Sequence, residues 1–449
     1  MWMSQIDNRS FLRYVGILLG ISLIVSTTVM VTPIAIMLAI ITILFILESY
    51  NNKINLYILF VLIPLPANIT LLNLELNLSI PFLLICYFIK LFMKNDAAIM
   101  KFNKFDFLSV SFLIIGLLPA INKVGGFEGW LNGYVKAFII PVAIYFYIRI
   151  YYRDYNKYGL HILYAIVTSL IVFSGYALFE FFVLNQSSVN FVGDSEYRLA
   201  GGILGQGNGL AMNLEKIIPF ILLLVLTSKS NKNNNDQFRK ALVLVLVFFA
   251  SVLFLSLSRG GWASIVILVF MVLLLYKKFF AVIIACILTT ISVLVIEPIR
   301  TRLFTDESTL FFRTDLWEMS IKIFKENFLF GIPLNDFVYY YEQNFRTVVS
   351  LSRSHNILLD ILVFTGVVGL LYFSVLFLSV LISAKKGLKN NDDPIKRVII
   401  IGFLFMIITT FIHGQIDSPM FSYSRDVFVW IEFALFSNVL ISRVGHNNE

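Results

Sequence analysis

The chain of 449 residues has little charge and almost no cysteine: 14% of its residues are charged, and it has two cysteines. A soluble domain carries about 25% charged residues, so the composition excludes an ordinary soluble protein. Both cysteines, Cys86 and Cys286, lie within apolar runs, which argues against a structural disulfide or a thiolate metal site. Linkers rich in Pro or Ser and internal repeats are also lacking. The sequence is therefore expected to form one membrane domain over residues 1–449.

Long apolar runs take the place of charge, and 59% of the residues are hydrophobic. Several runs reach or approach the roughly 18 to 20 residues that cross a bilayer. We therefore predict an all-α, polytopic integral membrane protein with about 12 to 14 transmembrane helices. The predicted spans are 13–31, 32–48, 54–66, 78–93, 105–121, 131–149, 158–185, 206–228, 238–256, 260–276, 279–296, 355–384, 397–413 and 426–443. No cleavable signal peptide is expected, because the first apolar run continues into a second one.

The net charge of +8 indicates membrane topology, and it does not indicate a nucleic-acid partner. Most Lys and Arg residues fall in alternate connections on the side of the N-terminus, such as "SKSNKNNNDQFRK" and "AKKGLKNNDDPIKR". By the positive-inside rule, this side and both termini are cytoplasmic.

The opposite, external side has one long loop, residues 297–354. Within it Leu316, Trp317 and Ile323 recur at helical spacing, which predicts a short amphipathic helix at the membrane surface. Gly331 ends this helix, and a second aromatic stretch, "FVYYYEQNF", follows. A loop of this length with so many aromatic residues is more typical of function than of disorder.

Three cationic or basic side chains fall at helix ends on the external side. Arg259 lies in the turn "SRGG", Arg198 in "EYRLAGGILGQGNG" and His355 in "SRSHNILLD". Taken alone, Arg259 is equally well explained as an interfacial anchor. Together, two guanidinium groups suit a diphosphate and an imidazole suits a base near neutral pH. The set predicts displacement of a lipid diphosphate from a sugar, with arginines in the place of a metal.

The motifs resemble those of the O-antigen ligase and O-antigen polymerase superfamily of bacterial surface polysaccharide assembly. The resemblance rests on "RLAGGILGQGNGLAMNL", "SRGGW", "FRTDLWEMSIKIFKENFLFGIPLNDF" and "SHNILLDILVFTGVVGLLYF", and it covers residues 195–380. It implies a glycosyltransferase that needs neither metal nor cofactor and acts at the external face of the bacterial inner membrane. The implied partners are an undecaprenyl-diphosphate-linked glycan donor, a glycan or lipid-core acceptor, membrane lipid and other polysaccharide-assembly proteins, with no nucleic acid.

By matching position, the resemblance gives catalytic roles to Arg198, Arg259 and His355. The arginines would hold the diphosphate, and the histidine would assist the acceptor. Arg313 is a weaker substrate-binding candidate, and pairing with Asp315 or Glu318 on the surface helix is the explanation we favour. Asn208 is another candidate, for a sugar hydroxyl, but it also suits a helix cap.

The same two interpretations apply to Asn356. Lys216, a candidate for substrate binding, stands with Glu215 inside the predicted span 206–228. Either the span begins later, or the two residues line a polar cavity. Asp417 and Arg425 border the last external loop, as an interfacial pair or as acceptor contacts.

Several functions remain open. A polymerase joins one lipid-linked chain to another, whereas a ligase moves a finished chain to a different acceptor, and the motifs do not separate the two. We favour the polymerase, because no second acceptor type is identified. A transporter or flippase would need charge spread through the spans, and apart from Glu180, Glu215 and Lys216 the spans are read as poor in charge. If the protein were a non-enzymatic membrane scaffold, the convergence of Arg198, Arg259 and His355 on one side would be a coincidence.

Overall fold

The computed structural model describes most of the chain from residue 102 to residue 441. Its described residues are 102–185, 207–227, 236–295, 307–344, 351–389, 393–421 and 423–441, with Tyr57, Phe60, Leu199, Arg300 and two short strands at 68–71 and 74–77. The strands, β1 (Asn68–Leu71) and β2 (Leu74–Asn77), form an antiparallel hairpin in which Asn68 pairs with Asn77. The predicted spans 13–31, 32–48 and 78–93 lie outside the described residues, as does nearly all of 54–66.

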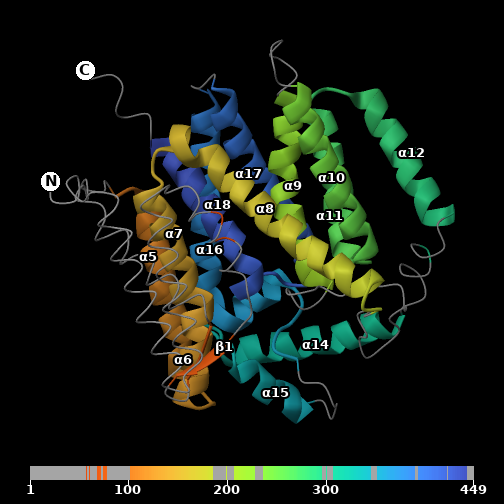
Figure 1. Cartoon of the computed structure of the whole chain (residues 1–449). Helices are drawn as coiled ribbons and strands as arrows, with labels where there is room; N and C mark the ends of the chain where they lie inside the picture. Colours follow the sequence, from red (N-terminus) through yellow and green to blue (C-terminus); the bar gives the residue numbers. More distant parts are fainter. Residues whose placement is uncertain are drawn as a thin grey trace, which may run out of the picture.

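The remaining described elements are helices (Figure 1), and the prediction of an all-α polytopic membrane protein is confirmed. In chain order they are α5 (Lys104–Leu117), η2 (Leu118–Asn122), α6 (Phe127–Tyr134), η3 (Val135–Ile139), α7 (Ile140–Tyr151), α8 (Tyr155–Phe182), α9 (Gly207–Thr227), α10 (Asp236–Leu255), α11 (Arg259–Leu275), α12 (Phe279–Val295), α14 (Glu307–Glu326), α15 (Asp336–Asn344), α16 (Ile357–Lys389), α17 (Pro394–His413) and α18 (Tyr423–Ile441). Among the described residues, seven helical stretches are long and apolar enough to cross a membrane, and α11 and part of α18 are shorter apolar helices.

Local signals place the starts of several helices. The side chain of Asn103 accepts from the backbone N–H groups of Phe105 and Asp106, which caps α5. Asp154 caps α8 in the same way, and Asp393 caps α17, which has a proline in its first turn. Such caps satisfy the backbone donors that the first turn of a helix leaves without partners. They lie close to the predicted span ends, because polar capping residues also mark the limits of apolar runs.

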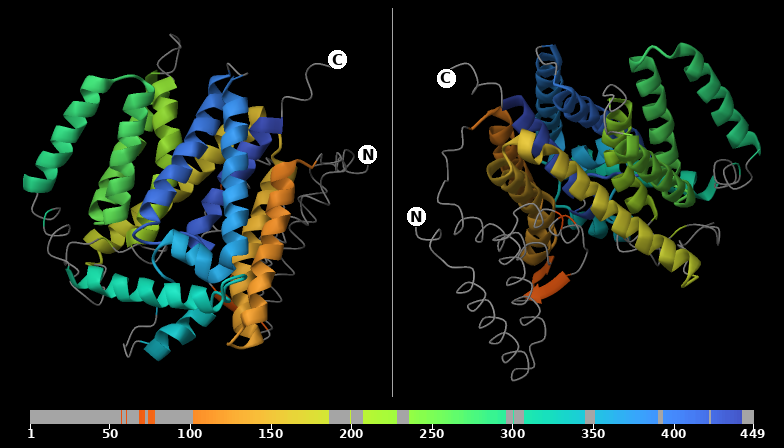
Figure 2. Two further views of the ribbon diagram at one scale, coloured as in Figure 1. Left: turned by 180° about the vertical axis from the view of Figure 1, so that it is seen from behind. Right: turned by 45° about the horizontal axis from the view of Figure 1, so that its top comes forward.

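The bundle has two different ends. Helix α14 lies across one of them, together with α15, in both the front view and the view from behind (Figures 1 and 2). We call this the loop end; α9, α11 and α16 begin there and α17 ends there. The opposite end, which we call the basic end, holds the turns from α7 to α8 and from α16 to α17, with Arg153, Lys386 and Arg397 among its cations. This distribution agrees with the charge asymmetry of the sequence.

The core of the bundle is made by α17, which packs against α9, α11 and α18, while α18 also packs on α7. A second apolar cluster lies toward the loop end, where α14 packs on α16. Leu316, Met319 and Ile323 of α14 are buried there, whereas Ile321 is 42% exposed. The predicted amphipathic helix of the external loop is thus present, with one apolar side against the bundle.

The spanning helices contain more buried charge than the sequence indicated. Asp106 of α5 accepts from Arg149 of α7 (Nε to Oδ1, 3.1 Å), and both side chains are almost fully buried. Glu432 of α18 is 1% exposed, and Asp360 of α16 is fully buried. The view that charge in the spans is confined to Glu180 and two residues of α9 is therefore wrong. Single charges within an apolar run are masked by their neighbours, and their partners lie on other helices.

Helix α16 is broken at Gly366, where φ is +63° and ψ is −164°. The predicted span 355–384 therefore divides into a short helix at the loop end, residues 357–365, and a long helix, residues 367–389. The break matters for the functional site, because the short helix carries the segment that follows His355.

Candidate functional site

The turn "SRGG" lies at the loop end, between α10 and α11, as predicted. Ser258 is the N-cap of α11, and its Oγ accepts from the backbone N–H of Gly261 at 3.3 Å. The residue before it, Leu257, has φ of +49°, a left-handed conformation that a leucine rarely adopts. Arg259 therefore stands in the first turn of a capped helix, whose N-terminus carries a positive partial charge.

The glycines of this turn serve helix packing. A Cβ on Gly260 would overlap the imidazole of His413 at the end of α17. A Cβ on Gly261 would lie 3.2 Å from Cβ of Ala211 in α9, closer than most real Cβ contacts. The first turn of α11 thus fits directly against α9 and α17, which fixes the place from which Arg259 extends.

A small, partly open pocket lies beside this turn. Helix α9, the α11 N-terminus, α14 and the segment after α17 all contribute to it. It is lined by Asn208, Ser258, Arg259, Gly260, Arg313, His413, Ile416 and Asp417. The structure thus brings together four of the residues singled out in the sequence: Asn208, Arg259, Arg313 and Asp417.

His355 joins this pocket through Asp417. Nδ1 of His355 lies 2.7 Å from Oδ1 of Asp417, and Asn208 donates from Nδ2 to the other carboxylate oxygen at 3.1 Å. The side chain of Asp417 is 3% exposed and that of His355 is 25% exposed. His355 has φ of +56°; a non-glycine residue in that region stores strain, and such residues cluster at functional sites. Asp417 thus fixes the orientation of an imidazole that remains accessible.

The segment that carries His355 is held from two sides. Trp317 of α14 donates from Nε1 to the carbonyl of Ser354 at 3.2 Å. Arg353 donates to the carbonyls of Ser418 and Met420 at 3.5 and 3.4 Å. The tryptophan of the "RTDLW" motif is therefore a support for the histidine segment.

Asn356 acts as a helix cap. Its Oδ1 accepts from the backbone N–H groups of Leu358 and Leu359 at 3.0 and 3.2 Å, and its Nδ2 donates to the carbonyl of Gln415 at 3.4 Å. The contacts of Asn356 are therefore those of a helix cap, whereas Asn208 lines the pocket.

The turn after α14 locks onto the break in α16. Gly331 has φ of +71°, and the backbone N–H of Ile332 donates to the carbonyl of Val363 at 2.8 Å. In the opposite direction, Val367 donates to the carbonyl of Phe328 at 2.9 Å. We call this contact between residues 327–332 and 363–368 the glycine latch. It accounts for Gly331 and Gly366, because at these two residues each backbone passes too close to the other for a Cβ.

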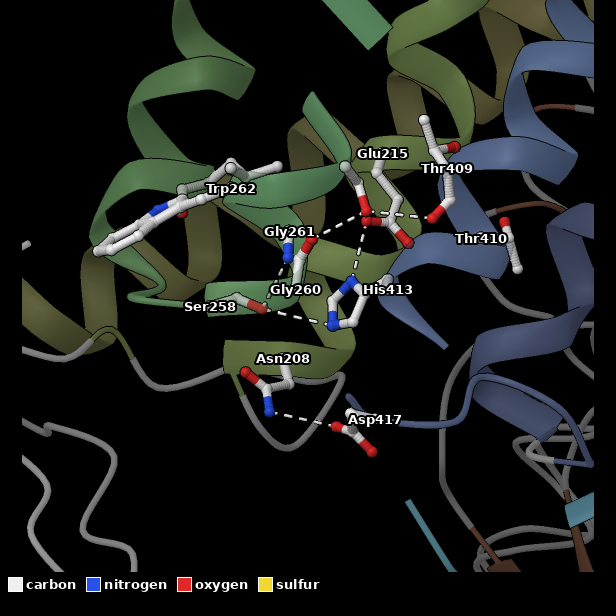
Figure 3. Close-up of polar contacts among 12 residues, drawn as sticks. Asn208, Glu215, Ser258, Gly260, Gly261, Trp262, Thr409, Thr410, His413 and Asp417 are labelled. Atoms are coloured by element: carbon white, nitrogen blue, oxygen red, sulfur yellow. Dashed lines mark hydrogen bonds and ion pairs between the residues drawn. The ribbon is translucent and has the colours of Figure 1, made fainter. Parts of the chain in front are cut away.

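A chain of buried polar contacts lies behind the pocket (Figure 3). Nδ1 of His413 is 2.9 Å from Oε2 of Glu215 in α9, and Nε2 is 3.4 Å from Oγ of Ser258. All three residues are at most 1% exposed. Two of them were noticeable in the sequence, as a glutamate inside a predicted span and a histidine near the predicted external side, but no sequence pattern paired them. Helix α9 runs without a break from Gly207 to Thr227, so the alternative that the span begins after Glu215 is wrong.

The other candidates are not among the described residues that line the pocket. Lys216 is fully buried, and its positive charge attracts the carboxylate of Glu432 in α18. Arg198 lies outside the described residues; the next residue, Leu199, donates its backbone N–H to the carbonyl of Leu255 at the end of α10. Arg425 is in the first turn of α18, and its side chain is outside the described set.

Within the described part of the chain, no group of three or more His, Cys, Asp or Glu side chains has an arrangement that would hold a metal ion. The chemical groups of the pocket are instead two guanidinium groups, one carboxylate with its imidazole, and a helix N-terminus. Such groups bind anions and transfer protons.

The fold and the pocket define a class, a multi-pass membrane protein with a polar site at one end of its bundle. Residues 244–374 match the family model described as O-antigen ligase, and this confirms the resemblance to the O-antigen ligase and O-antigen polymerase superfamily. A search of curated proteins finds no match. The family indicates an enzyme that transfers glycans in surface glycan assembly. The matched region contains Arg259, Arg313 and His355, whereas Asn208, His413 and Asp417 join them from outside it.

Proposed function

We propose that the protein is a glycosyltransferase that moves an undecaprenyl-diphosphate-linked oligosaccharide or polysaccharide to an acceptor hydroxyl at the external membrane face. The observation that carries the proposal is one pocket at the loop end that holds Arg259 and Arg313 and adjoins the His355–Asp417 pair. The loop end is external in this proposal, and both termini are cytoplasmic, in the bacterial inner membrane. Residues 195–380 form the catalytic region of one membrane domain.

The arginines are assigned to the donor. As the sugar leaves the carrier, negative charge grows on the diphosphate, and guanidinium groups form charge-assisted, bidentate bonds to such oxygens. Arg259 and Arg313 extend from different helices into the same pocket, beside the positive N-terminus of α11. Arg198 is given the same role through the family resemblance. With this charge in place the reaction proceeds without a metal.

His355 is assigned to the acceptor. When its Nδ1–H donates to the carboxylate of Asp417, Nε2 carries the lone pair that accepts a proton. The acceptor oxygen forms a bond to the anomeric carbon, and its proton passes to Nε2. The bond from the anomeric carbon to phosphate oxygen breaks, and undecaprenyl diphosphate leaves with the electron pair. Asn208, which donates to the same carboxylate, orients Asp417.

The assignments are tested in a strain that lacks the native copy. Arg259→Ala and His355→Ala are each expected to abolish glycan transfer with unchanged amounts of protein in the membrane. Arg397→Ala is the matched control, since this exposed arginine lies at the basic end of α17. Normal surface glycan with either of the first two variants would contradict the role of that residue.

The same deletion separates the two acceptors. Single repeats on the normal final acceptor would indicate a polymerase, which we favour because no second acceptor type is identified. Full-length chains that remain on the carrier lipid would indicate a ligase.

A transporter of lipid-linked glycans is the second candidate, and the buried charges of the spans favour it. Glu215, Lys216 and Glu432 lie in the bundle interior. Their neighbours, however, are one another and His413, and they are at most 1% exposed, so they stand in packed protein. The Arg259→Ala variant separates the two functions. If this variant loses glycan transfer but still carries the lipid-linked glycan across the membrane at the normal rate, the transporter is ruled out.

A further inference from the structure

The chain of contacts from Glu215 to Ser258 has a consistent direction of donation. The backbone N–H of Gly261 donates to Oγ of Ser258, and the hydroxyl of Ser258 can then donate to Nε2 of His413. Nδ1–H of His413 donates to Oε2 of Glu215. Each donor in the series thus has an acceptor, and the series joins α9, α17 and the N-cap of α11.

This arrangement is costly for a bundle in lipid. A buried ionisable pair loses its hydration, and apolar residues of similar size often replace such pairs with no loss of stability. Packing alone therefore does not explain why Glu215 and His413 are both fully buried beside the polar pocket.

What the pair touches indicates its use. The imidazole of His413 lies against Gly260, the residue next to Arg259, so closely that no Cβ fits between them. It also contacts the N-cap Ser258. The first turn of α11 is thus set by His413 from two directions, and Arg259 projects from that turn into the pocket.

We propose that His413, oriented by Glu215, is a positioning residue that holds the Ser258 cap and thereby aims Arg259 at the diphosphate of the donor. The inference rests on the proposed function, in which Arg259 binds that diphosphate. His413 also lines the pocket, and its effect on binding is assigned here to the position of Arg259. A displacement of about 1 Å in a group that binds the reacting centre is enough to cost on the order of 100-fold in rate.

Substitutions on the two sides of one contact separate this role from simple packing. His413→Asn keeps an amide donor near the position of Nδ1, which faces Glu215, and removes the contact of Nε2 with Ser258 while the N-cap bond of Ser258 stays. Ser258→Ala removes the same contact from the other side, together with that N-cap bond, and leaves His413 and Glu215 in place. Thr410→Val is the control, since Thr410 is a buried neighbour on α17 whose hydroxyl donates to Sδ of Met406 at 3.6 Å.

The measurement is the affinity of the purified full-length protein, in lipid nanodiscs, for undecaprenyl diphosphate, with undecaprenol as the ligand that lacks phosphate. His413→Asn and Ser258→Ala are each expected to weaken diphosphate binding about 10-fold and to leave undecaprenol binding unchanged. In an Arg259→Ala background the same substitutions are expected to weaken it less than about 2-fold, because residues that act through one another are not additive. Thr410→Val is expected to match the parent in both backgrounds.

The outcomes distinguish this inference from the proposed function. Equal losses in the two backgrounds, or no loss with His413→Asn and Ser258→Ala, would overturn the positioning role. If Arg259→Ala alone binds undecaprenyl diphosphate as well as the unchanged protein, the assignment of Arg259 to the donor fails instead. Ser258→Ala changes little volume, so an unchanged affinity with this variant would overturn the positioning role even if His413→Asn does not fold.

Discussion

The glycine latch provides the sharpest test of how the site is held. Gly366 has φ of +63° and ψ of −164°, a region that only glycine occupies readily. A Cβ there would overlap the carbonyl of Leu329 and lie 2.5 Å from the nitrogen of Phe330. Gly366→Ala must therefore push residues 327–332 away from α16.

The cost follows from the contacts that cross the latch. Three backbone hydrogen bonds join the two segments, at 2.8, 2.9 and 3.3 Å. Moving the two segments apart by about 1 Å breaks these hydrogen bonds, and each broken bond costs about 0.5 to 1.5 kcal/mol. Backbone strain adds about 1 to 3 kcal/mol. The expected loss of stability is about 3 to 7 kcal/mol, which is large for one methyl group.

The assay is the apparent melting temperature of purified protein in detergent, with glycan transfer measured in parallel. Gly366→Ala is expected to lower that temperature on the order of 10 °C and to impair transfer, because the latch fixes α14 and the segment of His355. Gly175→Ala in α8 is the control: its Cβ meets nothing within 4 Å, and alanine is the better helix former by about 0.5 to 1 kcal/mol. A Gly366→Ala protein with normal melting and normal transfer would refute the reasoning.

Three further predictions concern the pocket. Arg259→Lys is expected to lose on the order of 100-fold in transfer rate, since an ammonium group cannot form the bidentate bond, and full activity would support a role as a membrane anchor. Asp417→Asn is expected to reduce turnover on the order of 100-fold, because His355 loses the carboxylate that fixes its tautomer; an unchanged rate would exclude the imidazole as base. EDTA is expected to leave turnover intact, and activity lost in EDTA and restored by Mg²⁺ or Mn²⁺ would contradict this.

The positions of the helices were predictable from sequence because lipid imposes a strong local constraint. The predicted spans 206–228, 260–276 and 397–413 correspond to α9, α11 and α17, with ends shifted by a few residues. Hydrophobic length and polar ends decide such limits, and both are local properties. The break in α16 was not predicted, since Gly366 is strained by a tertiary contact with the turn after α14.

The pocket was predictable only in part. Counting spans predicts that Arg259 and His355 lie at the same end of the bundle, as they do. It does not predict that Asp417 lies near both, because the order of helices around a bundle has no local pattern. Asp417 had a weak signal as an acidic residue that borders the last external loop. Glu215 had a stronger one, a charge inside a span, which is usually functional or paired. Its partner His413 required the packing of α17 on α9.

The charge of the pocket supports an anionic substrate independently of the family. Of the residues that line it, Arg259 and Arg313 are cationic and Asp417 is acidic, and the N-terminus of α11 adds a positive partial charge. Asp417 also accepts from Asn208 and holds His355. Guanidinium groups form charge-assisted, bidentate bonds to phosphate oxygens, and two of them line this one pocket from different helices. A diphosphate offers several oxygens for such bonds, whereas a cation offers none. The charge of the pocket therefore fits the diphosphate of the proposed donor better than a cationic ligand.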